Sequence, residues 1–223
     1  MDQTSMKIIV IGGGNVGGFI INNIHDFTQK FEVVGILDDD LSKVGTELWG
    51  VKVLGQISDI KNILNKDNNI GVVISIANPL VKERIIKSLA QYKNIIYPNF
   101  IHIKTWISSK VKLGVGNIIY PGVSINYESE IHDFTTINMN VSLGHNCTLN
   151  NFVTLSPAVN LAGFTFVGKS SFVGIGACCV QGLKIGNNSL IGAGAVIIRD
   201  VPDGVTVVGN PGKIIKLSEL SEQ

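Results

Sequence analysis

The sequence predicts a two-part chain: a short Rossmann-like α/β domain over residues 1–100, followed by a left-handed parallel β-helix over residues 101–215 and a tail over 216–223. Two observations predict this fold class. Strand-like and helix-like segments alternate in the first hundred residues, and an aliphatic residue then recurs at every sixth position. A G-x-G-x-x-G segment between the first strand and the first helix agrees with the α/β assignment.

The first hundred residues are expected to form a parallel sheet with helical crossovers. Apolar helical spacing predicts a helix over 16–29, and Ser58 is placed to cap a second helix that ends near residue 65. Asn78 as N-cap and Pro79 at the first helical position start a third helix, which reaches about residue 91. Short apolar runs predict strands over 7–11, 31–37, 71–76 and 94–97.

The repeat begins at Ile101 and keeps an unbroken register of six to Ile197. Cys179 is the one member of this series that is not Ile, Leu or Val. The residue two positions before each member is usually small or β-branched, and the residue after it is often Gly, Asn, Ser or Ala. Each hexad therefore forms a short strand and a corner. Three hexads close one coil of a triangular prism, so residues eighteen apart stack on neighbouring coils.

The segment from Gly12 to Gly17 reads GGGNVG, and Asp38 follows it by about twenty residues, as in dinucleotide-binding folds. Glycines let a phosphate approach the backbone N–H groups of a helix N-terminus. A full dinucleotide fold needs two βαβαβ halves, and this domain has room for about one. A mononucleotide or a nucleotide sugar is therefore favoured over NAD, with a purely structural glycine turn as the alternative.

Three aspartates end the second predicted strand, at the sheet edge where ligands bind in open α/β folds. A carboxylate at this position can accept a hydrogen bond from a ribose hydroxyl or a base N–H. The alternative is a solvated turn. That alternative is favoured for Asp40 and stays open for Asp38 and Asp39.

His145 lies at a corner of the repeat, where side chains point outward. An imidazole titrates near neutral pH and can remove a proton from an amine or hydroxyl, although an exposed corner histidine without a role is the alternative. Stacking by eighteen places Tyr127 and Gly163 at its position on neighbouring coils, and Glu128 at that of Asn146.

A metal site is not expected in the repeat. A zinc site on a β-helix needs three histidines with two of them closely spaced, whereas His102, His132 and His145 are widely separated.

Composition narrows the functional classes. The formal net charge of +1 and 16% charged residues give no case for binding nucleic acid. The apolar stretches are too short to span a bilayer, and the N-terminus lacks the features of a signal peptide. Three cysteines form neither a disulfide framework nor a metal-ligand spacing. A cytoplasmic protein is the expectation.

Several segments together resemble the bacterial sugar acyltransferases: KIIVIGGG, GILDDD, YPNFIH, the GHNC around His145, and the closing GNPGKIIK. This family includes sialic acid O-acetyltransferases and N-acetyltransferases of nucleotide-linked 4-amino-4,6-dideoxy sugars. The similarity covers nearly the whole chain. It implies a homotrimer, acetyl-CoA bound between neighbouring subunits, and direct acetyl transfer with His145 as general base and Asn146 beside it.

The resemblance also implies two sets of binding residues. Those expected to bind acetyl-CoA are Thr154, Gly174, Ile175, Ala193 and, at a phosphate, Lys213. Those expected to bind a UDP, GDP or dTDP sugar are Gly14, Asn15, Val16, Asp38, Asp39, Ala77 and Asn78. Members of the family usually carry acidic residues on both sides of the histidine. Here Gly144 and Asn146 stand there, so Glu128 or Glu130 would have to supply the charge.

The function predicted from these features is acetyl-CoA-dependent N-acetylation of a nucleotide-linked amino sugar. Attack by an unprotonated amine asks little of the base, which favours an amino sugar. O-acetylation of sialic acid or another sugar is the nearest alternative. A nucleotide-binding trimer without catalysis is the alternative from another class.

Cofactor binding separates these hypotheses from a dehydrogenase. The resemblance implies that acetyl-CoA binds. Because the α/β domain has room for only half of a dinucleotide fold, we expect NADH not to bind at micromolar concentrations. Isothermal titration calorimetry with each compound measures this. Micromolar affinity for NADH together with no affinity for acetyl-CoA would reverse the choice.

Overall fold

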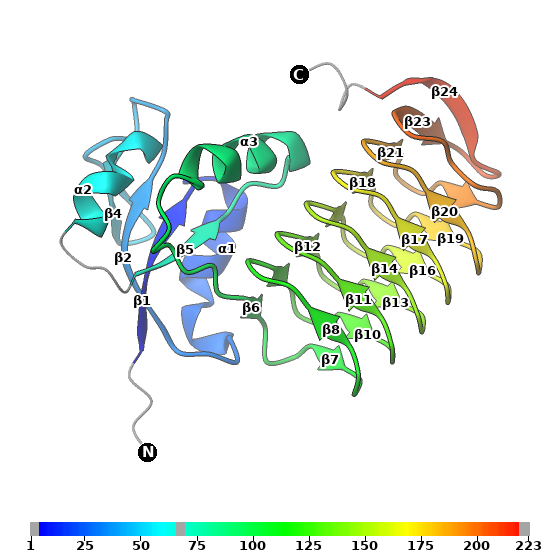
Figure 1. The fold of residues 1–223 in the computed structure, drawn as a ribbon, viewed down its shortest axis with the longest axis horizontal. Coiled ribbons are helices and arrows are strands. Elements are labelled where there is room, and N and C mark those ends of the chain that lie inside the picture. The colour runs from blue at the N-terminus through cyan, green and yellow to red at the C-terminus, as the bar shows by residue number, and fades with distance from the viewer. Residues whose placement is uncertain (1–4, 66–69, 219–223) are drawn as a thin grey trace.

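The computed structural model describes residues 5–65 and 70–218, and it divides the chain into an α/β domain and a prism of stacked coils (Figure 1). Residues 1–4 and 219–223 lie outside the described residues. The first group belongs to the N-terminus in which no signal peptide is expected, and the second to the expected tail. No helix in the described part is long and apolar enough to cross a bilayer.

The α/β domain contains a five-stranded sheet in the order β3-β4-β2-β1-β5, with β3 paired antiparallel and the other pairs parallel. Its strands are β1 (Met6–Ile11), β2 (Phe31–Leu37), β3 (Glu47–Leu48), β4 (Val51–Gly55) and β5 (Gly71–Ile74). Its helices are α1 (Asn15–Asn22), α2 (Ile60–Leu64) and α3 (Pro79–Leu89), with 3₁₀ turns at Ile24–Asp26 and Ile57–Asp59. The parallel α/β arrangement agrees with the prediction. The β3–β4 hairpin was not predicted.

Two predicted helix boundaries are wrong. The first helix ends at Asn22 rather than near residue 29, because the side-chain amides of Asn22 and Asn23 donate to the carbonyls of Gly18 and Phe19, at 2.7 and 2.8 Å. Such side-chain bonds compete with helix continuation.

Ser58 does not cap the second helical segment. That segment opens as a 3₁₀ turn capped by Gln56, whose backbone N–H donates to Asp59 at 2.9 Å, and Ser58 lies exposed within the turn. Asn78 does cap α3, as predicted, and accepts bonds from the backbone N–H groups of Leu80 and Val81. The strand expected over 94–97 is reduced to a single bridge between Gly71 and Ile96.

The prism consists of two-residue strands spaced six residues apart, as the repeat predicted. They are β6 (Phe100–Ile101), β7 (Trp106–Ile107), β8 (Lys112–Leu113), β9 (Ile118–Ile119), β10 (Ser124–Ile125), β11 (Glu130–Ile131), β12 (Thr136–Ile137), β13 (Ser142–Leu143), β14 (Thr148–Leu149), β15 (Thr154–Leu155), β16 (Asn160–Leu161), β17 (Phe166–Val167), β18 (Phe172–Val173), β19 (Cys178–Cys179), β20 (Lys184–Ile185), β21 (Leu190–Ile191) and β22 (Val196–Ile197).

These strands form three parallel faces. The first face runs through β6, β9, β12, β15, β18 and β21, the second from β7 to β22, and the third from β8 to β20. Leu143 pairs with Ile125 below and Leu161 above, so partners are eighteen residues apart as predicted. The repeating aliphatic side chains fill one continuous core. Beyond β22, β23 (Val205–Val208) and β24 (Lys213–Leu217) extend the first face, and β24 crosses the boundary expected at residue 215.

The α/β domain packs on the first face of the prism, and its helix α3 contacts that face (Figure 1). Lys82 of α3 is 1% exposed, and its Nζ donates to the Phe134 carbonyl at 2.9 Å and to the Thr136 hydroxyl at 2.8 Å. Glu83 forms a salt bridge with Lys169 at 2.8 Å. Hydrogen bonds and ion pairs of this kind offset the free-energy cost of burying polar and charged groups. The two parts of the chain are therefore joined through polar groups as well as apolar ones.

Replacing Lys82 with Met should change the pH dependence of stability. Burial lowers the pKa of Lys82 to about 7, whereas a lysine in the unfolded chain titrates near 10.4. Between these values the unfolded chain binds a proton that the folded protein lacks. The wild type therefore gains stability as pH rises, by at most about 1.4 kcal/mol per pH unit from this group.

Chemical denaturation from about pH 7 to about pH 10 measures this gain. The difference in unfolding free energy between wild type and the Lys82→Met variant should increase in favour of wild type as pH rises. The control is Lys61→Met, which replaces an exposed lysine of α2 and should leave the slope unchanged. A constant difference between wild type and Lys82→Met across the range would contradict the prediction.

Candidate active site

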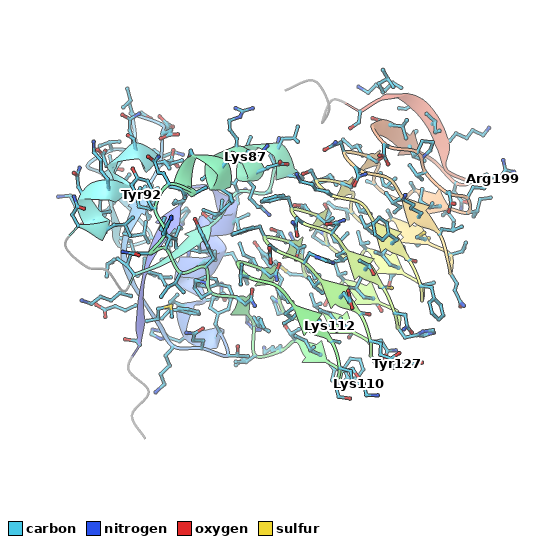
Figure 2. The ribbon with its side chains drawn as sticks, in the orientation of Figure 1. Lys87, Tyr92, Lys110, Lys112, Tyr127 and Arg199 are labelled. Atoms are coloured by element: carbon cyan, nitrogen blue, oxygen red, sulfur yellow. The ribbon has the colours of Figure 1, made fainter. Side chains whose placement is uncertain are left out.

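His145 projects from the turn between β13 and β14, on the edge where the second and third faces meet; this edge is called the distal edge. The Tyr127 ring stacks on the imidazole with centroids 5.2 Å apart and an angle of 8°. Phe164 meets it edge-on at 4.9 Å. Figure 2 shows Tyr127 and Lys110 projecting together from this edge. The predicted stacking of Tyr127 and His145 is confirmed, and the two aromatic rings hold the imidazole in place.

Gly163 lies one coil beyond His145, and its lack of a side chain lets the imidazole pack against its backbone. A Cβ added at Gly163 would lie 2.8 Å from Nε2 and 3.0 Å from Cε1. The backbone N–H of Gly163 has no hydrogen-bond partner among the residues the structure describes. The imidazole therefore packs directly over the Gly163 backbone, at a position where any side chain on residue 163 would meet the ring.

The other ring nitrogen of His145 is held by hydrogen bonds. Its Nδ1 lies 2.9 Å from Oδ1 of Asn146, and Nδ2 of Asn146 donates to Oε2 of Glu128 at 3.1 Å. Glu130, the alternative source of charge, lies in β11 and pairs with Lys112 at 2.6 Å. The carboxylate that reaches the histidine through Asn146 is therefore that of Glu128.

The glycine loop joins β1 to α1 and is tied to the acidic end of β2. Asp38 accepts a bond from the Gly13 backbone N–H at 2.7 Å and one from Lys43 Nζ at 2.9 Å. Burial alone would raise the pKa of Asp38, but bonds from the Asp40 and Gly13 backbone N–H groups and from Lys43 outweigh it and lower the pKa. Asp38 therefore braces the loop as a carboxylate, whatever else it binds.

The neighbouring aspartates differ from Asp38. Asp39 is exposed, and its Oδ1 accepts a bond from the Ile57 backbone N–H at 3.0 Å. Asp40 accepts bonds from the backbone and hydroxyl of Ser42, which agrees with the turn favoured for it.

A cavity of about 440 Å³ opens beside Asp39 between α2 and α3. Its polar lining includes Ser58, Lys61, Arg84 and Tyr92, and Figure 2 shows Tyr92 on this side of the domain. Sequence reasoning missed Lys61 and Arg84. Their exposed positions on two separate helices gave no signal that both face one cavity.

The residues expected to bind acetyl-CoA are divided between two places. Ile175 and Ala193 lie one coil apart on the edge between the first and second faces, and both are exposed. Gly174 is buried beside Ile175, and Lys213 is exposed at the start of β24. Thr154, in contrast, is 3% exposed, and its hydroxyl donates to the carbonyl of Ala77 at 2.9 Å. Within one chain, Thr154 contacts the α/β domain.

One chain does not bring all the expected site residues together. The α/β domain covers the first face, which is opposite the distal edge that carries His145. Gly14, Asn15 and Val16 surround the start of α1, Ala77 and Asn78 precede α3, and Ile175 lies across the second face from His145. Among the described residues no group of three or more His, Cys, Asp or Glu side chains could hold a metal ion.

Comparison with known proteins identifies the family. The PglD N-terminal domain model matches residues 7–89. A GDP-perosamine N-acetyltransferase from Escherichia coli O157:H7 is 31% identical over 158 residues, which cover 66% of this chain and 69% of that protein. PerB from Caulobacter crescentus, solved with CoA and GDP-perosamine, is 30% identical with a TM-score of 0.86, covering 94% of this chain and 97% of that one.

The chain belongs to the hexapeptide-repeat family of bacterial sugar acetyltransferases.

This acetyltransferase is also similar to the acetyltransferase domain of PglB from Neisseria gonorrhoeae, solved with acetyl coenzyme A. That domain is 29% identical with a TM-score of 0.84, covering 95% of this chain and all of that one. The predicted combination of a Rossmann-like domain and a left-handed β-helix is confirmed by these likenesses. The protein is an acyltransferase that uses acetyl-CoA, as the sequence indicated.

Substituting Gly163 with Ala should lower acetyl transfer while leaving the fold intact. The added methyl group would lie 2.8 Å from Nε2 and would displace the imidazole, so we expect kcat to fall at least about tenfold. Gly182→Ala is the control on the next coil, where an added Cβ meets open space but φ is +78°. It should cost about 1 kcal/mol of stability without changing kcat. Equal rates for wild type and Gly163→Ala would contradict a dependence of the reaction on this position of the imidazole.

Proposed function

We propose that this acetyltransferase transfers the acetyl group of acetyl-CoA to the amine of a nucleotide-linked amino sugar of the 4-amino-4,6-dideoxy type. The observation that carries the proposal is the environment of His145, whose Nδ1 is held by Asn146 while Nε2 lies over Gly163, where a side chain would clash with the ring. The perosamine N-acetyltransferases among the similar proteins support an amino sugar as acceptor.

His145 acts as the general base in one direct transfer. Nε2 accepts a proton from the sugar amine as the amine nitrogen attacks the thioester carbonyl carbon and forms the new C–N bond. The oxygen that becomes negative in the tetrahedral intermediate receives a hydrogen bond from a backbone N–H, and we assign this role to Gly163, whose N–H has no partner among the described residues. The C–S bond then breaks, and the CoA sulfur takes the proton from the imidazolium.

The α/β domain binds the nucleotide part of the acceptor. The helix start at Gly14, Asn15 and Val16 presents backbone N–H groups to phosphate, and Asn78 begins the adjacent helix. The cavity beside Asp39 suits a nucleobase, because a carboxylate accepts bonds from base N–H groups while Arg84 and Lys61 provide donors.

A homotrimer completes the site. The α/β domain and His145 lie on opposite sides of the prism in one chain, so a sugar held by one subunit would meet the histidine of a neighbour. The exposed apolar side chain of Ile175, at 59%, lies on an edge that such an assembly would cover. Acetyl-CoA would then lie between subunits along Ile175 and Ala193, with Lys213 at a phosphate.

The His145→Ala variant tests the proposed base. Release of free CoA thiol is measured with acetyl-CoA and a panel of GDP-, UDP- and dTDP-linked amino sugars. Loss of the base should lower kcat by roughly 10²-fold to 10⁴-fold. His132→Ala, at an exposed histidine elsewhere on the prism, is the control and should retain the wild-type rate.

Two outcomes would reject the proposal. No turnover with any sugar, despite clear nucleotide binding, would exclude catalysis. Transfer to sialic acid or another hydroxyl acceptor, with none to the amino sugars, would establish O-acetylation instead.

A further inference from the structure

The hydrogen bonds around Asn146 have a fixed direction. An ionised carboxylate can only accept hydrogen bonds, so Glu128 must face the amide nitrogen of Asn146 rather than its oxygen. The amide oxygen then faces Nδ1 of His145 at 2.9 Å, and this oxygen can only accept. Nδ1 must therefore carry the proton of the neutral imidazole, which leaves Nε2 without one.

We propose that Glu128 is a positioning residue for His145: through Asn146 it selects the imidazole tautomer whose Nε2 can accept a proton. The tautomer selection is a property of the folded chain, and its catalytic consequence rests on the function proposed above. Glu128 comes from the coil before His145, eighteen residues from Asn146. The arrangement therefore depends on the stacking of coils rather than on residues adjacent in sequence.

The surroundings of Glu128 favour this role over that of a solvated surface charge. Its second oxygen lies 3.8 Å from Lys110 Nζ, so the two carboxylate oxygens have different partners. Lys110, Glu128 and Asn146 have φ angles of 66°, 56° and 55° and occupy equivalent corner positions on successive coils. This shared left-handed conformation places the three side chains in one row along the distal edge.

Of the charged and titratable groups described near His145, Glu128 is the carboxylate that contacts the hydrogen-bond chain to its Nδ1 atom. Tyr127 and Phe164 pack against the ring itself. The Cys147 thiol is buried and bonds to the Ala162 carbonyl. Glu130 is engaged by Lys112 on the third face.

The first test compares Glu128→Gln with Glu130→Gln. The two glutamates have similar side-chain exposure, 48% and 42%, and each has a lysine partner, so the variants remove the same charge from matched settings. Glutamine can donate as well as accept, so Asn146 is no longer held in one orientation. We expect kcat to fall roughly tenfold for Glu128→Gln, with KM for acetyl-CoA unchanged, and no change for Glu130→Gln.

The second test repeats Glu128→Gln in an Asn146→Asp background. An aspartate at residue 146 accepts directly from Nδ1, so the orientation no longer depends on Glu128. Glu128→Gln should therefore cost nothing in this background, where it also removes the repulsion between the carboxylates of residues 128 and 146. An equal loss of kcat in both backgrounds would show that Glu128 acts by a route other than Asn146, and would overturn the proposal.

The third test observes the tautomer directly and needs no substrate. Nitrogen-15 NMR of the protein with labelled histidine, above the titration range of imidazole, distinguishes protonated from unprotonated ring nitrogens. His145→Asn identifies the His145 signals. We expect the proton on Nδ1 in wild type and in Glu130→Gln, and a mixture of tautomers in Glu128→Gln.

The two proposals can fail separately. Absence of acetyl transfer with a tautomer that responds to Glu128→Gln would reject the proposed function and keep the role of Glu128. A tautomer and a kcat that both stay unchanged in a folded Glu128→Gln variant would overturn the role of Glu128 and leave the function standing.

Discussion

The parallel pairing of each residue with the one eighteen positions later is the constraint on which the site depends. Backbone bonds fix this register from coil to coil, and the aliphatic core closes the prism only when every third hexad returns to the same face. Tyr127, His145 and Gly163 come together for this reason, as do Glu128 and Asn146. A rigid scaffold of this kind holds these groups in place before any ligand arrives.

The second determinant is the attachment of the α/β domain to one face of the prism. Lys82 and Thr154 both bond across this junction, and burial of such polar groups is tolerable only when they are paired. The junction therefore favours one arrangement of the two parts. The glycine loop is then kept on the side of the prism opposite His145, which is the geometry that led us to propose a site shared between copies of the chain.

Much of this architecture could be predicted because six-residue periodicity is a long-range rule written in local sequence. The rule places Tyr127 beside His145 and Glu128 beside Asn146 without any structure. The rule could not decide between Glu128 and Glu130. Glu128 lies at a corner and contacts Asn146, whereas Glu130 lies in β11 and pairs with Lys112.

The α/β domain was less predictable, because its boundaries depend on individual side-chain bonds. Competition from Asn22 and Asn23 ends α1 early, and Gln56 displaces Ser58 as a cap. The β3–β4 hairpin turns at Trp49-Gly50, where both φ angles are positive, but a tryptophan in that conformation is unusual and the sequence did not predict it.

The same six-residue phase that made the prism predictable limits how its length can change. Removal of one residue between Tyr127 and His145 would turn every later aliphatic side chain out of the core, whereas gain or loss of a whole coil preserves the phase. Viable length variants of such a chain should thus differ by multiples of a coil, or by loops that bulge from an edge.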